Sequence, residues 1–393
     1  MAAPWLHAVG AGTIGYSDNV LGAPSSAREG DARPIASPYL QLSLGLIATR
    51  EKERVNFTAN YQHLFTYFFA PRDFDSSDAL NATGVFELSP RDTLSIGLGA
   101  TSSAFTQLFL GATNAQGASV ERNLGIRTLR LALTEEWSHQ WSEEFRSLQS
   151  VLLSTITRFD APIADSGLSA TGRLGGEYQF PRDTIGALAS FTFLRAEDLR
   201  LVNTSAAGSM ERGYLVDGVA TWRRELFESW SLDVSAGAAA VFRPGMDSDP
   251  EPIANVGVGY RSETFEGRAS YAHDQVTSLE TSSVLKRDEG ALSVTGTVSD
   301  TYNLRINGGV NLGRYEERGV ELTQHGNVWS AQLQLLWDPR PVQLALAFTQ
   351  HEQFGADPGN ITLRNMSRRA VMLTVSGTYP PMRQRPPASE GGM

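Results

Sequence analysis

Apolar and polar residues alternate one by one along much of this chain, in segments of roughly 9–14 residues. The clearest example is 39–46, where Leu40, Leu42, Leu44 and Leu46 fall on one face. The residues between them, Gln41, Ser43 and Gly45, fall on the other. A period of two matches the β-strand, whose successive side chains point to opposite faces, and does not match a helix.

The same pattern recurs and predicts about 18 strands, with boundaries good to a few residues. They are expected at 4–17, 37–50, 54–68, 78–89, 93–105, 126–138, 145–159, 167–180, 184–195, 213–224, 230–242, 252–261, 266–277, 286–299, 302–314, 327–337, 341–350 and 367–379. The run Val151-Leu152-Leu153 breaks the alternation and suggests a bulge in the seventh strand.

The connections between expected strands alternate in length. Short, turn-forming stretches follow the even-numbered strands, at 51–53, 89–92, 181–183 and 338–340. Longer stretches follow the odd-numbered ones, at 18–36, 106–125, 196–212 and 351–366. This asymmetry is typical of outer-membrane barrels, whose short turns face the periplasm. We therefore predict an all-β fold: a transmembrane, antiparallel, up-and-down β-barrel over 1–379, followed by a disordered periplasmic Pro/Gly-rich tail at 380–393.

Tryptophans support this interpretation, because their rings favour the membrane–water interface. Six are expected at the short-turn ends of strands and form a predicted interface girdle: Trp5, Trp137, Trp141, Trp222, Trp230 and Trp337. A second girdle is expected at the opposite rim, from Tyr16, Tyr39, Tyr67, Phe68, Phe69, Phe105, Phe159, Tyr214 and Tyr315.

The overall composition agrees with a strand-built membrane protein. The 393 residues are 41% hydrophobic, with a formal net charge of −10 and a mean hydropathy of −0.22. No apolar run of about 18–20 residues is present, which excludes ordinary spanning helices. The absence of cysteine excludes disulfides and thiolate metal sites. The acidic balance argues against nucleic acid as a partner. Met1-Ala2-Ala3-Pro4-Trp5 lacks a signal peptide, so we treat the chain as a mature, outer-membrane form.

The face opposite the apolar one supplies the predicted lining of a lumen. An 18-stranded barrel is wide enough for an aqueous channel. The predicted pore-lining residues are Asn56, Asn60, Gln62, Asn81, Glu87, Arg130, Arg173, Glu177, Asp217, Arg268, Arg305, Asn307 and Gln332. Charges of both signs and neutral amides favour a hydrated solute over a lipid. The mixed charges are interpreted mainly as a lattice of cross-strand pairs, with a track of weak solute sites as the alternative.

Catalytic and metal-binding signatures were sought as well. None of the known hydrolase, nucleotide or dinucleotide motifs is present, and the six histidines are scattered. The neighbours His273 and Asp274 are interpreted as a solvated rim pair rather than an acid–base site. The acidic stretch 247–251 lacks the spacing of an EF-hand. We expect no enzyme activity, no cofactor and no bound metal.

One short stretch resembles a known class of protein. Gly15-Tyr16-Ser17-Asp18-Asn19-Val20, followed by 39–45, looks like the first strands of outer-membrane barrels of the exopolysaccharide-secretion type. The strand count resembles the 18-stranded barrels that pair with a polysaccharide-export lipoprotein. The resemblance implies a polysaccharide cargo and a periplasmic polysaccharide-export protein as partner, besides the outer-membrane lipids.

The sequence is compatible with four functions, which we rank. The leading hypothesis is an outer-membrane channel for a secreted polysaccharide, at the last step of a Wzx/Wzy-type exopolysaccharide pathway. The alternative is a general diffusion porin or small-solute channel, which would allow a trimer through a flat apolar outer patch. A third hypothesis is a structural barrel with a sealed lumen, and an outer-membrane hydrolase ranks last.

Overall fold

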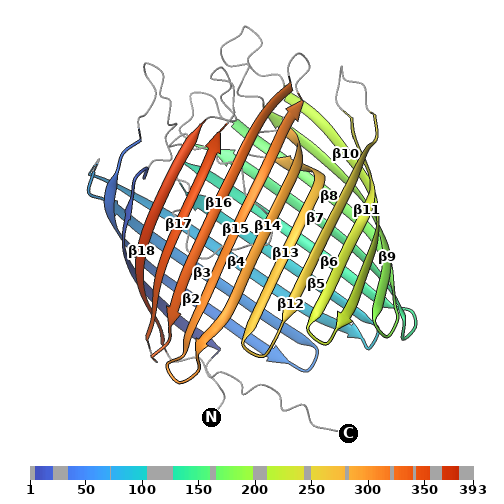
Figure 1. Ribbon diagram of the computed structural model, residues 1–393, viewed down its shortest axis with the longest axis horizontal. Helices are drawn as coiled ribbons and strands as arrows, with labels where there is room; N and C mark the ends of the chain where they lie inside the picture. The colour runs from blue at the N-terminus through green and yellow to red at the C-terminus, as the bar shows by residue number, and fades with distance from the viewer. Residues whose placement is uncertain are drawn as a thin grey trace.

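The computed structural model describes residues 5–20, 34–70, 72–103, 127–159, 165–197, 210–242, 249–278, 283–318, 323–339, 342–354 and 365–379. These segments form one sheet of eighteen strands, each antiparallel to its neighbours in the chain. The first strand also pairs with the last, so the sheet closes into a barrel of tilted strands (Figure 1). The predicted fold class is therefore confirmed. No helix in the described segments is long and apolar enough to cross a membrane.

The strands are β1 (Leu6–Ser17), β2 (Ser37–Lys52), β3 (Val55–Phe68), β4 (Asp73–Ser89), β5 (Asp92–Ser103), β6 (Thr128–Gln140), β7 (Phe145–Arg158), β8 (Asp165–Gln179), β9 (Asp183–Glu197), β10 (Met210–Phe227), β11 (Trp230–Phe242), β12 (Glu251–Arg261), β13 (Phe265–Ser278), β14 (Ser283–Ser299), β15 (Leu304–Arg318), β16 (Thr323–Trp337), β17 (Val342–Phe354) and β18 (Met366–Tyr379).

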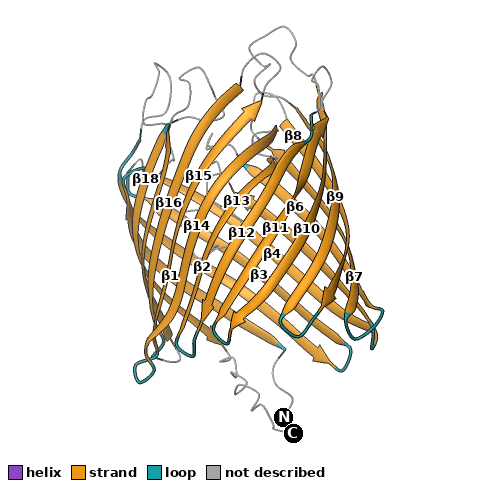
Figure 2. Cartoon of the chain, turned by 45° about the vertical axis from the view of Figure 1, so that its right-hand side comes forward, coloured by secondary structure: helices purple, strands orange, loops and turns teal. Residues whose placement is uncertain are grey.

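All the connections at one end of the barrel are short, as the teal turns at the bottom of Figure 2 show. They include 53–54 between β2 and β3, 90–91 between β4 and β5, and 228–229 between β10 and β11. At the other end the lengths vary: 69–72 is short and 104–127 is long. We call these the turn end and the loop end. The expected tail at 380–393 lies outside the described residues.

The expected bulge in β7 is wrong. The register of β7 against β6 and β8 runs without a shift through 151–153. Irregularities occur instead at the turn ends of other strands, between Glu87 and Ser89 and between Thr297 and Ser299. The broken alternation in β7 arises because Leu152, like Leu148 and Ile156, is an apolar side chain on the inner face.

The seam between β1 and β18 is reinforced at its loop end. Thr13 and Thr374 share a hydrogen bond of 2.9 Å between their hydroxyls. Just beyond β1, the Asp18 carboxylate accepts from the Arg369 backbone N–H at 2.6 Å, and the Asn19 amide donates to the Ser367 carbonyl at 2.9 Å. These bonds fasten the chain that leaves the first strand to the last strand.

The largest buried cluster lies directly beside this seam, inside the barrel. It consists of Val20, Tyr39, Phe68, Ala347, Ala370 and Met372, with Ile35 packed against it. Gly15 leaves room for the Tyr39 ring, because a Cβ there would lie 2.4 Å from the ring's Cζ. The backbone bond from Val20 N to Ile35 O, 3.0 Å long, joins the two ends of the connection that contributes to the cluster. Burial of apolar surface thus stabilises one sector of the inner wall.

Candidate functional site

Strand register divides the wall into an apolar outer face and a polar inner face. Ile14, Leu44 and Leu312 point outward and are 66%, 63% and 61% exposed. Their sequence neighbours on the other face include Thr13 and Ser43, both buried polar residues. Because side chains alternate strictly along each strand, a single known orientation fixes the face of every other residue in that strand.

Every tryptophan predicted for the girdle lies toward the turn end. Trp230 packs on Tyr260, with 4.9 Å between ring centroids. The indole N–H of Trp222 donates to the Asp183 carboxylate at 2.8 Å, and that of Trp141 to the Ser147 hydroxyl at 2.9 Å. Trp5 precedes β1, while Trp137 and Trp337 lie near or at the turn ends of β6 and β16. Their role as an interface girdle stays a prediction.

Three aromatics expected at the opposite rim point inward instead. Tyr39, Phe68 and Tyr315 are 0%, 2% and 3% exposed, and that part of the prediction is wrong. Alternation assigns Tyr39 and Phe68 to the same face as Gln41 and Thr66, which hydrogen-bond to each other at 3.0 Å inside the barrel. An aromatic residue at a strand end can point either into the barrel or toward lipid, and its presence alone does not show which. Phe105, expected at the same rim, lies outside the described residues.

The strand register assigns all the predicted pore-lining residues to the inner face. On β3 and β4, Asn60 lies opposite Asn81, and Gln62 donates to the inner hydroxyl of Ser43 at 2.6 Å. On β15 and β16, the Asn307 amide lies 3.5 Å from the Gln334 carbonyl oxygen. The others on this face are Asn56, Glu87, Arg130, Arg173, Glu177, Asp217, Arg268, Arg305 and Gln332. Whether they line a conducting pore stays a prediction.

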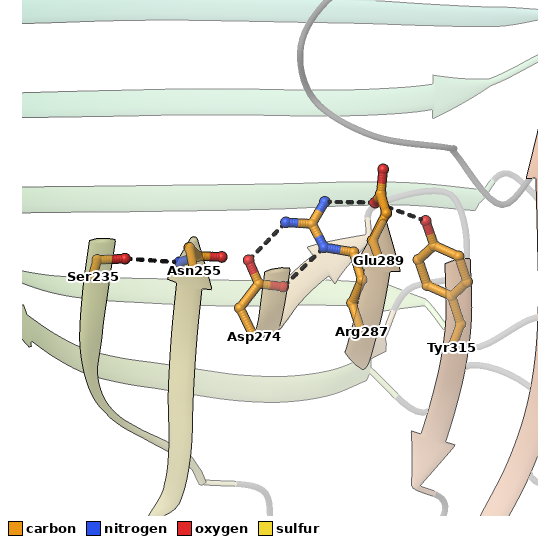
Figure 3. Close-up of polar contacts among 6 residues, drawn as sticks. All are labelled: Ser235, Asn255, Asp274, Arg287, Glu289 and Tyr315. Carbon is orange, nitrogen blue, oxygen red and sulfur yellow. Dashed lines mark hydrogen bonds and ion pairs between the residues drawn. The ribbon is translucent and has the colours of Figure 1, made fainter. Parts of the chain in front are cut away.

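A charged network occupies the inner wall at β13–β15 (Figure 3). The Arg287 guanidinium forms two bonds to Asp274, Nε to Oδ1 at 2.8 Å and Nη2 to Oδ2 at 2.6 Å. Its Nη1 reaches Glu289 at 3.3 Å, and the Tyr315 hydroxyl donates to the same carboxylate at 3.4 Å. One guanidinium thus binds two carboxylates, and its two bonds to Asp274 fix the orientation of the Arg287 side chain.

Further cross-strand pairs continue around the wall. Asp233 on β11 is bridged by Arg223 at 2.6 Å and by Arg268 at 3.0 Å. Arg146 on β7 pairs with Glu177 on β8. The Asn255 amide donates to the Ser235 hydroxyl at 3.1 Å, beside the Arg287 network (Figure 3). The lattice of paired charges is the main feature of this sector.

Three charged residues of the predicted lining, Glu87, Arg173 and Arg305, stand apart from that lattice. Arg173 on β8 and Arg305 on β15 have no hydrogen bond or ion pair to any residue in the described part of the chain. Arg305 is exposed and lies at the turn end of its strand. These two guanidinium groups therefore face the lumen with their charge uncompensated, and a passing solute can contact them.

The sequence analysis missed Arg146, Arg287 and Glu289 as inner-wall residues. A signal was available for the last two, because Leu285, Arg287 and Glu289 alternate with residues of the outer face. The expected rim pair of His273 and Asp274 is wrong, since the two side chains point to opposite faces. His273 bonds Asp288 outside the barrel and Asp274 bonds Arg287 inside it.

Metal-binding groups were also considered. Among the residues that the structure describes, no group of three or more histidine, aspartate or glutamate side chains can hold a metal ion. The first two residues of the acidic stretch 247–251 lie outside the described residues. Glu251, at its end, pairs with Lys286 at 3.1 Å.

Comparisons with known proteins bear on the fold alone. No family model and no curated protein is similar enough to this sequence to match it. Among solved structures, Pseudomonas aeruginosa OccK2 in complex with glucuronate aligns with 95% of this chain and 98% of its own, at 11% identity and a TM-score of 0.49. Acinetobacter baumannii OccAB3 aligns with 95% of this chain and 99% of its own, at 10% identity and a TM-score of 0.48. The ferric enterobactin receptor of Pseudomonas aeruginosa covers 94% of this chain and 80% of its own, at 9% identity and a TM-score of 0.47.

These likenesses are too weak to indicate a solute or a mechanism. The closed eighteen-stranded ring and its apolar outer face are decisive for location, because a closed barrel leaves no unpaired strand edge in lipid. The chain is a bacterial outer-membrane β-barrel. Its function has to be inferred from its own inner wall.

Proposed function

We propose that this barrel is a passive channel that lets small hydrated solutes cross the outer membrane. The observation that carries the proposal is the polar inner wall, built from amides, hydroxyls and paired charges. Paired charges rigidify a wall without binding a solute tightly. Amides and hydroxyls offer many weak hydrogen bonds, so that a solute can enter and also leave.

The unpaired arginines refine the proposal. Arg173 and Arg305 lie on β8 and β15, on different parts of the wall, and both carry charge that no described residue compensates. An excess positive charge that faces water raises the local concentration of anions. We therefore expect these two positions to attract anions locally, whereas the unpaired carboxylate of Glu87 on the same face attracts cations.

Single-cysteine blocking tests the channel directly, because the natural sequence contains no cysteine. Ser330 and Ala331 are adjacent on β16, the first on the inner face and the second on the outer. In planar bilayers, Ser330→Cys should lose most of its conductance after reaction with a bulky water-soluble thiol reagent. Ala331→Cys is the matched control and should keep its conductance. No measurable conductance in the unmodified protein, or equal block of both variants, would contradict the proposal.

Export of a secreted polysaccharide is a second candidate, favoured by the resemblance of 15–20 to exopolysaccharide-secretion barrels. The periplasmic export partner belongs to this candidate. However, four of these six residues have local roles in this barrel: Gly15 accommodates Tyr39, Asp18 and Asn19 bind β18, and Val20 packs inside. Barrel closure accounts for the motif without any cargo, and we therefore prefer the small-solute channel. Loss of a surface polysaccharide after gene deletion, restored by the intact gene, would reverse this preference.

A further inference from the structure

Two groups of ionisable side chains lie on the outer, lipid-facing surface, where charge is costly. In the first, His63 Nδ1 and the Tyr61 hydroxyl both bond the same oxygen of Asp78, at 2.7 and 2.8 Å. Tyr61 and His63 belong to β3 and Asp78 to β4, with His63 and Asp78 directly opposite in register. Leu44 and Leu46, beside them on β2, are exposed on the same surface.

The second group repeats the first in sequence spacing and geometry. His273 Nδ1 and the Tyr271 hydroxyl bond one oxygen of Asp288, at 2.5 and 2.9 Å. In both groups the histidine precedes the aspartate by 15 residues, and the tyrosine precedes the aspartate by 17. In the ring of eighteen strands, β3 and β13 are ten apart, so the two groups lie on nearly opposite sides of the barrel (Figure 1).

Both groups lie at the same height. His63 is eight residues beyond Val55, where β3 begins at the turn end, and His273 is eight residues beyond Phe265, where β13 begins. With about 3.4 Å per residue and a tilt of about 40°, eight residues rise about 20 Å, near the outer edge of an apolar band about 25 Å tall. Both groups therefore lie near the outer edge of the apolar band, with Phe65 and Tyr67 still exposed beyond His63 toward the loop end.

Each histidine keeps one ring nitrogen available. A carboxylate only accepts, so the bond to aspartate assigns a proton to Nδ1. No residue in the described segments hydrogen-bonds to Nε2 of His63 or of His273. The aspartate thus orients each imidazole and leaves its Nε2 available to a ligand.

A guanidinium adjoins each group. Arg314 on β15 lies directly opposite Asp288 in register, is exposed, and has no hydrogen bond or ion pair within the described part of the chain. Arg127 approaches the first group by donating from Nη2 to the Ser76 hydroxyl at 3.1 Å, two residues from Asp78. The guanidinium thus places a positive charge beside each histidine–aspartate pair.

We propose that these two groups are binding sites for phosphorylated headgroups of outer-leaflet glycolipid, each contacted by the imidazole Nε2 and the arginine. A phosphate at this height supplies the anion that the arginine needs at the edge of lipid. The tyrosine and aspartate are positioning residues that hold the imidazole. This function is independent of what crosses the barrel.

The outward pair of His139 and Asp92 provides a matched control. Its Nδ1–Oδ1 bond is 2.6 Å long, like the others, but it lies at the turn end between Trp137 and Trp141. In an asymmetric outer membrane that end meets the inner leaflet, which lacks the phosphorylated glycolipid. His139→Gln should therefore leave glycolipid binding unchanged.

The experiment measures glycolipid that co-purifies with the barrel from a bacterial host, by mass spectrometry after extraction in mild detergent. His63→Gln/His273→Gln should retain about fivefold less glycolipid per barrel. Arg314→Gln, whose side chain is exposed and unpaired among the described residues, tests the second site without disturbing the histidine–aspartate bond. It should roughly halve the amount retained, because one of two sites is lost.

Titration with purified lipid A and with its dephosphorylated form identifies the recognised group. We expect the intact barrel to bind lipid A at least about fivefold more tightly than the dephosphorylated form. Equal binding of the two forms would overturn the proposal. So would unchanged retention in Arg314→Gln, or an equal loss in His139→Gln, since the loss would then follow from any altered surface charge.

Discussion

The Arg287 network predicts that one substitution lowers stability in the natural protein and raises it in a variant. Arg287 lies between Asp274 and Glu289, and the three side chains are 18%, 19% and 5% exposed. Removing one member of a buried ion pair costs about 3–5 kcal/mol, because a charge is left without its partner. We expect Arg287→Gln to lower the free energy of unfolding by about 3 kcal/mol, at the lower end because the wall faces a hydrated lumen.

A second substitution should then restore stability. In Arg287→Gln, the carboxylates of Asp274 and Glu289 face each other without a cation. Asp274→Asn removes one of these charges, so the double variant should be about 1–2 kcal/mol more stable than Arg287→Gln alone. In the natural background the same Asp274→Asn should be destabilising, because it breaks the bidentate bond.

Urea unfolding in phospholipid vesicles, followed by tryptophan fluorescence, measures all four members of this cycle. Arg305→Gln is the control, since Arg305 is exposed and has no partner among the described residues; it should change stability by less than about 0.5 kcal/mol. Additive effects of the two substitutions would refute the reasoning. They would mean that the lumen's water screens these charges completely.

Three further predictions concern other parts of the barrel. Gly15→Ala should lower the unfolding midpoint, because the added Cβ displaces the Tyr39 ring. Gly10→Ala should leave the midpoint unchanged, because nothing lies within 4 Å of its added Cβ. Heat-dependent mobility in gels compares the unfolding temperatures of the two variants. Asn19→Ala should cost about 1–2 kcal/mol in urea unfolding, because the bond to β18 is lost; an unchanged midpoint would show that the seam does not need it. Arg173→Gln/Arg305→Gln should shift the reversal potential in a salt gradient toward cation preference, and a shift toward anions would contradict the proposed role of these charges.

The sequence predicts the strands well where one face meets lipid and the other water. Val55 to Phe65 alternates plainly, and β3 is found there. Prediction fails at the loop end, where β4 begins at Asp73 rather than at 78, and β14 at Ser283 rather than at 286. At 73–77 and 283–285 apolar and polar residues no longer alternate, although the ladder of hydrogen bonds continues.

The inner wall is predictable in outline but not in its pairing. Alternation is enough to assign Arg268 and Asp217 to the inner face. It does not give register, and register decides that Asp233, two strands away from Arg268, is the residue Arg268 contacts. The inward position of Tyr39 was missed for another reason: an apolar cluster inside a barrel has no periodic signature of its own.

The β1–β18 seam has a consequence for biogenesis. The Thr13–Thr374 bond joins residues that are 361 positions apart, so it can form only after the last strand has been made. Until then the nascent sheet has two open edges, which are prone to pair with other chains. The contacts from Asp18 and Asn19 to β18 therefore form last and hold the closed seam together. Substitutions there should appear in cells as slow maturation and increased proteolysis, even where the mature barrel resists denaturation.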